Sequence, residues 1–341
     1  MSDPRFNGEE LALSAQLRYV VDAEPGIRRM RRGNGFSYAR EVGDGRITEL
    51  DRKRIEALAI PPAWRHVWIC SDPHGHLQVT GRDQADRKQY LYHKEWERVR
   101  DQAKFDRMSS FGRSLPHLRQ QVEGDLRLRG MVQPRIVALA VAVLDQTLIR
   151  VGNDRYAVQN GSFGLTTLTA DHADIEQGVV RLNFVGKGGA EQEVALRNRR
   201  LASLVAQCQE LNGQRLFSYR AGKDRMAAVT SDDINEYLRR VMGSEFTAKD
   251  FRTWGASTVA VEALGPLPSP SVDPDTDFLA AVDLAAEALG NTRAVCRQSY
   301  VHPHLAEAFA AGDLAEAWRT SRRSRWAARG ERALLRVLEH D

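Results

Sequence analysis

The chain has 341 residues, of which 42% are hydrophobic and 28% are charged, the balance of a water-soluble folded protein. This length favours two domains, and no apolar run approaches the roughly 18 residues that a membrane-spanning helix requires. The polar, acidic start of the chain does not resemble a signal peptide. The three cysteines are far apart and odd in number, which argues against a disulfide framework and favours a reducing compartment, by default the cytoplasm.

The basic residues are clustered although their excess is small. The formal net charge is only +4, yet four arginines fall within residues 28–32. Such clusters favour contacts with nucleic-acid phosphates, whereas a solvated basic face is the more common meaning of a charge run. A second group lies near the C-terminus and consists of Arg322, Arg323, Arg325 and Arg329.

The first part of the chain predicts strands and turns. Residues 36–39, 67–70 and 76–80 have the short apolar patterns of strands, and the last two flank a turn-rich segment typical of a hairpin. Residues 51–58 predict a short helix. We therefore expect a small β-rich domain over residues 1–100.

From about Tyr92 the pattern becomes helical, which predicts a larger, mainly helical domain over residues 101–341. Residues 94–108 are strongly charged with apolar spots. Residues 133–151 are apolar on most faces, so they predict a buried core helix that Arg150 nearly closes.

An insert of short strands is expected next, at residues 165–168, 179–185 and 191–196. The turn Gly186-Lys187-Gly188-Gly189 joins the last two strands, which suits a β-hairpin.

Four further helices are predicted near residues 198–211, 231–242, 247–264 and 275–289. Ser231 and Thr247 are candidate N-caps, and Gly290 is a candidate terminator. The expected fold class is α+β, with a small β-rich N-terminal domain and a larger, mainly α-helical domain that carries a small β-sheet insert.

Five polar side chains form a set suited to attack on a phosphodiester. Two guanidiniums can bind the nonbridging oxygens, an ammonium can protonate a leaving alkoxide, and an amide can donate a hydrogen bond. A phenol can hold the phosphoryl group covalently. In chain order these residues are Arg150, Lys187, Arg252, Asn291 and Tyr300.

Each member of this set also has a structural interpretation. A lysine at a hairpin tip is usually only solvated, and a tyrosine after a helix usually serves the fold. An asparagine that follows a glycine is a common left-handed helix cap. The two arginines have acidic neighbours in the sequence as candidate ion-pair partners: Asp145 or Asp154 for Arg150, and Asp250 or Glu262 for Arg252.

The order of these residues resembles that of the type IB DNA topoisomerases, most closely the compact poxvirus and bacterial branch, over residues 18–314. The resemblance implies the tyrosine recombinase/topoisomerase IB catalytic fold and double-stranded DNA as the partner. Tyr300 is then the nucleophile that forms a 3′-phosphotyrosyl bond. Arg150 and Arg252 stabilise the phosphate, and Lys187 protonates the 5′ oxygen.

The resemblance also sets expectations for the reaction as a whole. Positive and negative supercoils are relaxed by single-strand cleavage and religation, without a cofactor, a metal or ATP. The enzyme is expected to act as a monomer with the nucleoid in the cytoplasm. His74 and His76 resemble a metal-binding pair, but no cysteine or carboxylate cluster completes a site.

A segment before the helical domain matches the family's pattern for reading DNA. Its alternating basic and aromatic residues suit contacts with bases and phosphates in the major groove. The alternative is an edge strand whose tyrosines cover the core. Together with two later positions, the residues expected to contact DNA are Lys88, Gln89, Tyr90, Tyr92, Tyr156 and Lys249.

Asn291 departs from the family pattern, because many members carry histidine at this position. Asparagine can donate a neutral hydrogen bond to a phosphoryl oxygen but brings no charge. His302 and His304 are the other residues that can supply an imidazole nearby.

Two other functions stay open on the sequence alone. A tyrosine site-specific recombinase shares the chemistry, but recombinases typically carry histidine three residues before the second arginine, where this chain has Lys249. A non-catalytic DNA-binding protein on the same scaffold would show a degenerate site, and only Asn291 departs here.

Overall fold

A computed structural model describes residues 8–339, apart from 212, 223–224, 244–245 and 268–272 and the side chains of 155 and 156. The chain divides into two compact units, Met1–Asp106 and Arg107–Asp341, so the break falls after helix α3 (Lys94–Asp106). Within the described ranges no helix is long and apolar enough to cross a membrane.

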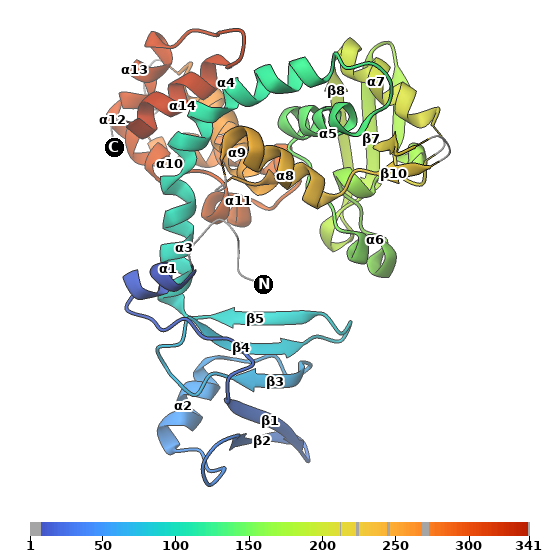
Figure 1. The fold of residues 1–341 in the computed structure, drawn as a ribbon. Coiled ribbons are helices and arrows are strands. Elements are labelled where there is room, and N and C mark those ends of the chain that lie inside the picture. Colours follow the sequence, from blue (N-terminus) through green and yellow to red (C-terminus); the bar gives the residue numbers. More distant parts are fainter. Residues whose placement is uncertain (1–7, 212, 223–224, 244–245, 268–272, 340–341) are drawn as a thin grey trace. The chain divides into compact units, whose positions relative to one another are not determined.

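The first unit is built on a five-stranded antiparallel sheet in the order β2-β1-β3-β4-β5 (Figure 1). Both β2 and β5 are therefore edge strands. In chain order the strands are β1 (Ile27–Arg32), β2 (Gly35–Arg40), β3 (Arg65–Ile69), β4 (Leu77–Arg82) and β5 (Lys88–Tyr92).

Side chains that alternate along the strands cover both faces of this sheet. On one face Ile27, Val67 and Val79 pack with Ile55 of helix α2 (Glu49–Ala57). On the other face Trp68 lies in a second cluster, which adjoins helix α1 (Gly8–Ser14) and α3 through the half-buried Tyr92. Both faces are thus occupied, which explains the β-rich unit that the sequence predicts.

The first arginine cluster forms strand β1, which the sequence analysis did not predict. Arg29 donates hydrogen bonds to the carbonyls of Ile60, Pro61 and Trp64, and Arg28 pairs with Glu41 at 2.7 Å. These two arginines therefore stabilise the fold. Arg28 is nevertheless exposed, as are Arg31 and Arg32, so Arg29 is the one arginine of the cluster that is partly buried.

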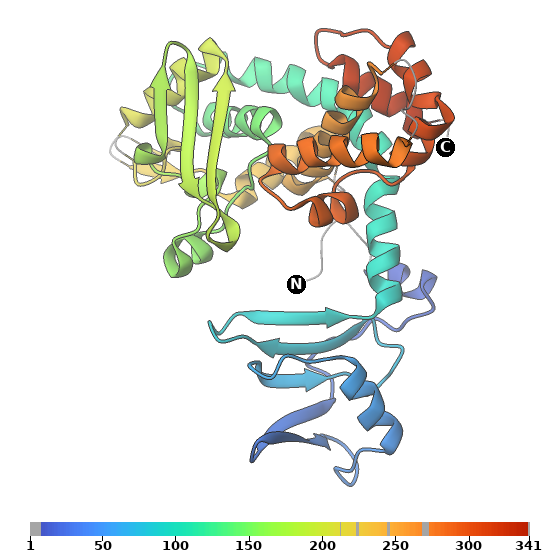
Figure 2. The same ribbon diagram turned by 180° about the vertical axis from the view of Figure 1, so that it is seen from behind.

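The second unit is mainly helical, with helix α9 (Ala248–Leu264) packed against α10, α14 and α4 (Figure 1). A three-stranded antiparallel sheet forms a separate part of this unit (Figure 2). Its strands are β6 (Ala173–Glu176), β7 (Val179–Val185) and β8 (Glu191–Arg197), and a two-stranded ribbon consists of β9 (Ser218–Arg220) and β10 (Met226–Ala228). The other helices are α4 (Met108–Asp125), α5 (Gln133–Thr147), α6 (Asp154–Asn160), α7 (Arg199–Gln209), α8 (Ser231–Met242), α10 (Pro274–Leu289), α11 (Arg293–Ser299), α12 (His304–Ala311), α13 (Asp313–Thr320) and α14 (Arg329–Glu339).

The predicted α+β fold class is confirmed, with two local corrections in the insert. Residues expected as a strand form a short 3-10 helix, Leu165–Thr167, because the Thr167 hydroxyl bonds to both the backbone N–H and the carbonyl of Gly164. Strand β6 was not predicted. The N-cap of α8 is Thr230 rather than Ser231, since its hydroxyl accepts from the N–H of Asp233.

The C-terminal arginines also stabilise the fold. Arg329 lies over the Trp318 ring at 4.3 Å and donates to its carbonyl, and Arg325 pairs with Glu123 of α4 at 3.2 Å. These contacts hold the segment before α14 against the body of the second unit.

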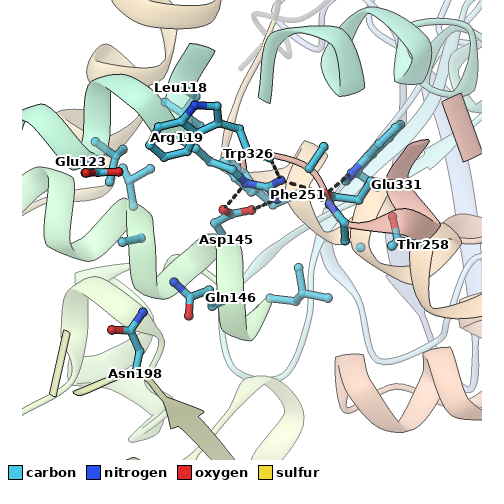
Figure 3. A pocket seen from close by; sticks show the side chains of 18 of the residues that line it. Leu118, Arg119, Glu123, Asp145, Gln146, Asn198, Phe251, Thr258, Trp326 and Glu331 are labelled. Atoms are coloured by element: carbon cyan, nitrogen blue, oxygen red, sulfur yellow. Dashed lines mark hydrogen bonds and ion pairs between the residues drawn. The ribbon is translucent and has the colours of Figure 1, made fainter. Parts of the chain in front are cut away.

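A buried ion-pair network fixes α14 to the helix that carries Arg252. Arg119 of α4 binds Asp145 of α5 at 2.8 Å and Glu331 of α14 at 2.7 Å (Figure 3). Glu331 also accepts a hydrogen bond from Trp254 of α9. The network lines a cavity of about 710 Å³. None of the predicted catalytic residues lines this cavity, so it is separate from the candidate active site.

Candidate active site

Arg150 was predicted to lie inside the helix over residues 133–151, but this prediction is wrong. It lies beyond the end of α5, which stops at Thr147. The chain leaves α5 at Leu148, a non-glycine residue with a left-handed φ of 55°. The Leu148 side chain fills the space that a Cβ on Gly255 of α9 would occupy, since that atom would lie 2.4 Å from Leu148 Cδ1. This contact between two helices turns the backbone at Leu148 and places Arg150 after the turn.

Arg252 is 5% exposed in the second turn of α9. Its guanidinium donates to the carbonyl of Leu148, the residue that caps α5, and to the carbonyl of Leu289, the last residue of α10. Burial, followed by the charge of Arg150, lowers the pKa of Arg252. Its Nε is buried and has no hydrogen-bond partner. A buried cation beside another cation requires an anion, which matches a bound phosphate.

Among the described residues, the ion pairs that offered a structural explanation for Arg150 and Arg252 do not form. Asp145 binds Arg119, and Asp154 binds Arg215 at 3.2 Å. The Asp250 carboxylate accepts from the N–H and hydroxyl of Thr247, which closes the N-terminus of α9. These aspartates are therefore paired elsewhere, and the guanidiniums of Arg150 and Arg252 are available to bind a ligand.

Asn291 orients Arg150. Its Oδ1 accepts a hydrogen bond from Arg150 Nη2 at 2.7 Å, whereas its Nδ2 is buried without a partner. The left-handed cap of α10 is Gly290, with φ of 57°, and Asn291 donates its N–H to Ala286. Asn291 is thus not the cap residue, and its amide presents a donor at the site.

Tyr300 ends α11, and its backbone is held from two sides. Its N–H donates to the carbonyl of Cys296 at 2.9 Å, and its carbonyl accepts from the hydroxyl of Ser257 at 3.2 Å. Ser257 is fully buried on α9, five residues after Arg252. Ser257 was not predicted, because residues five apart lie on different faces of a helix and no local pattern links it to Arg252 or Tyr300.

The electrostatic surroundings of Tyr300 favour its phenolate. The Arg252 guanidinium carbon lies 5.3 Å from the centroid of the Tyr300 ring. Burial raises the pKa of the phenol, but Arg252 first and then Arg150 and Lys187 outweigh that effect, so the pKa falls below its ordinary value. These three cations are therefore close enough to act on one phenol.

Lys187 stands in the turn between β7 and β8, so the predicted hairpin is confirmed. The turn closes through the N–H of Gly186, which donates to the carbonyl of Ala190 at 2.8 Å. Lys187 is exposed, and it makes no ion pair with the described part of the chain. Its ammonium is consequently free to donate a proton.

The predicted DNA-contacting segment is edge strand β5 of the first unit. Lys88, Tyr90 and Tyr92 share one face, where the two rings stack at 6.0 Å. Lys88 is held by Asp22 at 2.6 Å. Tyr92 packs on the core while Tyr90 is 39% exposed, so the strand is an edge strand that also presents an aromatic surface.

The remaining predicted residues have separate positions. Gln89 donates its amide to Asp83 at 2.8 Å on the other face of β5. Lys249 is exposed in the first turn of α9. The side chain of Tyr156 lies outside the described residues. His302 is buried and donates its N–H to Ser257, so it supports the backbone beside Tyr300.

The histidine pair that resembles a metal site has a structural role at His76. Its ring stacks on Tyr19 at 4.3 Å, and burial lowers its pKa to about 4. Among the described residues no group of three or more histidine, cysteine, aspartate or glutamate side chains is arranged to hold a metal ion.

Two guanidiniums, an amide and a phenol lie together and form an anion site suited to phosphoryl transfer on a nucleic acid. We call this group the phosphate-binding corner; it consists of Arg150, Arg252, Asn291 and Tyr300. The family described as eukaryotic DNA topoisomerase I, catalytic core, matches residues 92–314. The family described as bacterial DNA topoisomerase IB, N-terminal domain, matches residues 35–83. The chain belongs to the type IB DNA topoisomerases. It is an isomerase that acts on DNA.

Individual relatives agree with this family. DNA topoisomerase 1B of Acanthamoeba polyphaga mimivirus is 33% identical over 83% of this chain and 87% of the relative. DNA topoisomerase 1B of vaccinia virus, strain Copenhagen, is 25% identical over 50% of this chain and 52% of the relative. The XerH site-specific recombinase bound to palindromic difH substrate, in a post-cleavage complex, is 17% identical, covers 56% of this chain and 49% of its own, and has a TM-score of 0.35. That likeness is too weak to carry an argument for or against the recombinase alternative.

Proposed function

We propose that this topoisomerase relaxes supercoils of either sign through a transient break in one DNA strand, with Tyr300 as the nucleophile. The observation that carries the proposal is the pair of buried donors without partners, Arg252 Nε and Asn291 Nδ2, beside a phenol whose pKa is lowered. Unpaired buried donors are rare in folded proteins and are expected where a ligand binds.

The phosphate-binding corner acts first. Arg150 and Arg252 bind the nonbridging oxygens of the scissile phosphate, and Asn291 adds a neutral donor. Because these donors are fixed by the ends of α5 and α10 before DNA arrives, they stabilise the added charge of the pentacoordinate phosphate without reorganisation.

The covalent step exchanges one phosphoester for another. The Tyr300 phenolate attacks the phosphorus, a tyrosyl O–P bond forms, and the bond to the 5′ oxygen breaks. Lys187 gives its proton to that oxygen, which leaves as a 5′ hydroxyl. The strand stays attached through a 3′-phosphotyrosyl bond.

Rotation and resealing complete the cycle. The free 5′ end swivels about the intact strand, so torsion of either sign is released. The 5′ hydroxyl then attacks the phosphotyrosine and restores the original bond. Since the energy of the broken ester is kept in the new ester and side chains supply every charge, the reaction as proposed needs neither ATP nor a metal.

DNA is expected to contact the aromatic and basic face of β5 as well as the catalytic unit. Lys88, Gln89, Tyr90 and Tyr92 would hold bases and phosphates, with Tyr156 and Lys249 as further contacts. We propose that a single chain suffices for the reaction. The site of action is expected to be the nucleoid in the cytoplasm.

Relaxation of plasmids tests this function. With EDTA present and ATP absent, the wild-type protein is expected to relax both negatively and positively supercoiled plasmid. Relaxation of only one sign, or a requirement for metal or ATP, would contradict the proposal.

Variants of Asn291 test its role as a neutral donor. Asn291→Ala is expected to slow cleavage roughly 100-fold, because one hydrogen bond to the transition state is lost. Asn291→His retains a donor and keeps activity, whereas Asn291→Asp replaces the donor with a negative charge and loses more than alanine. Single-turnover cleavage of a nicked oligonucleotide measures these rates. Full activity of Asn291→Ala would show that cleavage needs neither the amide donor nor the hydrogen bond from Arg150 to Asn291.

Titration of Tyr300 tests the electrostatics directly. The ultraviolet difference spectrum between the wild type and Tyr300→Phe is expected to show phenolate formation at a lower pH than for an exposed tyrosine. Arg150→Ala removes a positive charge near the phenolate, so it raises the midpoint. A midpoint at or above that of free tyrosine would contradict the site as described.

A further inference from the structure

The position of Lys187 depends on its hairpin, and the tip of that hairpin has little contact with the protein. Gly188 and Gly189 both have positive φ, 81° and 80°, and a Cβ at either would meet nothing within 4 Å. The tip therefore does not fix the lysine. The base of the hairpin must do so.

One side chain at the base contacts both the hairpin and the phosphate-binding corner. Gln192 of β8 lies opposite Phe184 of β7. A Cβ on Gly186 would lie 2.8 Å from Gln192 Cγ, and a Cβ on Gly290 would lie 2.3 Å from Gln192 Oε1. Two glycines that are 104 residues apart thus make room for the same glutamine.

The contact at Gly290 joins the hairpin to the residues that bind phosphate. Gly290 stands between Leu289, whose carbonyl accepts from Arg252, and Asn291, whose amide accepts from Arg150. A shift of Gln192 would therefore change the distance between the Lys187 ammonium and the corner that holds the scissile phosphate.

The amide of the glutamine side chain also has a hydrogen bond on the hairpin itself. Its Nε2 donates to the carbonyl of Glu191 at 3.0 Å, which leaves Oε1 toward Gly290. Gln192 is half-buried, whereas its neighbours Glu191 and Glu193 are exposed on the other face of β8.

We propose that Gln192 is a positioning residue that docks the Lys187 hairpin on the C-terminal end of α10 and so sets where the lysine delivers its proton. This inference rests on the proposed role of Lys187 as the general acid. Its effect belongs to the leaving-group step and not to phosphate binding.

A sulfur leaving group separates this effect from general damage. A thiol has a pKa near 8.5, far below that of an alcohol, so a 5′-bridging phosphorothiolate leaves without protonation. Gln192→Ala is expected to slow cleavage of the ordinary oligonucleotide about 10- to 100-fold, since a misplacement near 1 Å costs that order of rate. On the sulfur substrate it should cleave at nearly the wild-type rate, as should Lys187→Ala.

The ratio of the two rates is the readout, because both are measured on one protein preparation and the fraction of folded enzyme cancels. Glu193→Ala, on the exposed face of β8, is the matched control and should leave the ratio unchanged. Gly290→Ala places a methyl group against Gln192, so its defect on the ordinary substrate should be less than additive with that of Gln192→Ala.

Three outcomes would overturn the inference. Equal slowing of Gln192→Ala on both substrates would place the glutamine in the fold or the phosphate site. Wild-type rates on both would give it no role. Failure of sulfur to rescue Lys187→Ala would remove the general acid itself, and would thus distinguish a fault in the proposed mechanism from a fault in the docking.

Discussion

Replacement of Tyr300 by phenylalanine is expected to abolish the covalent protein–DNA adduct while DNA binding continues. The substitution removes only the attacking oxygen, since the ring keeps its place over Arg252 and the backbone keeps its bonds to Cys296 and Ser257. The Ser257 hydroxyl beside Tyr300 is engaged with the Tyr300 carbonyl and the His302 N–H, so it is not expected to act as a substitute nucleophile.

Denaturing gels of a labelled nicked oligonucleotide measure this adduct. Tyr219→Phe, at a half-buried tyrosine on β9, is the matched control and should form the adduct at the wild-type rate. Adduct formation by Tyr300→Phe would place the nucleophile at another residue.

Arg252→Ala should show the second largest effect, a loss of cleavage rate of about 10³- to 10⁴-fold. Removal of one oxyanion donor or of a phosphate-binding arginine costs a rate of this order. The substitution also leaves the carbonyls of Leu148 and Leu289 without their donor, which costs about 1–3 kcal/mol of folding free energy for each buried group left unpaired.

Two measurements separate these consequences. Single-turnover cleavage reports the catalytic loss, and thermal unfolding reports the structural one. Arg252→Lys keeps the charge but not the forked donor geometry, so it should recover only part of the rate. Arg239→Ala, an exposed arginine of α8, is the control and should be nearly silent. A small rate effect with a large stability loss would make Arg252 a structural residue.

The sequence was sufficient for those parts of the site that depend on local signals. The Lys187 hairpin follows from its glycines between two apolar strands, and the start of α9 follows from Thr247 as the N-cap. Gly290 was predicted to end α10 and does so with a left-handed φ. These features need only neighbours in the chain.

The remaining features depend on contacts between distant segments. Leu148 adopts a left-handed conformation that leucine rarely takes, because its side chain packs into Gly255 of α9. Sequence periodicity therefore extended the helix through Arg150. The partners of Ser257 and Gln192 are likewise set by packing with Tyr300 and Gly290, so no local pattern indicates their roles.

In the first unit, contacts between distant segments also decide the role of the arginines in residues 28–32. Strand β1 was not predicted, because its arginines hide the alternation of a strand. Arg29 is held inside the unit by the carbonyls of Ile60 and Trp64, far along the chain. A basic cluster in the sequence can thus combine fold-stabilising arginines with exposed ones.

The central claim is that Tyr300 joins the 3′ end of the broken strand. The most direct measurement is mass spectrometry of the DNA-linked peptide after the adduct is trapped and digested, with an oligonucleotide labelled on either side of the break. We predict one peptide that contains Tyr300, joined through a 3′ phosphate. A linkage to any other residue, or to a 5′ phosphate, would contradict the mechanism.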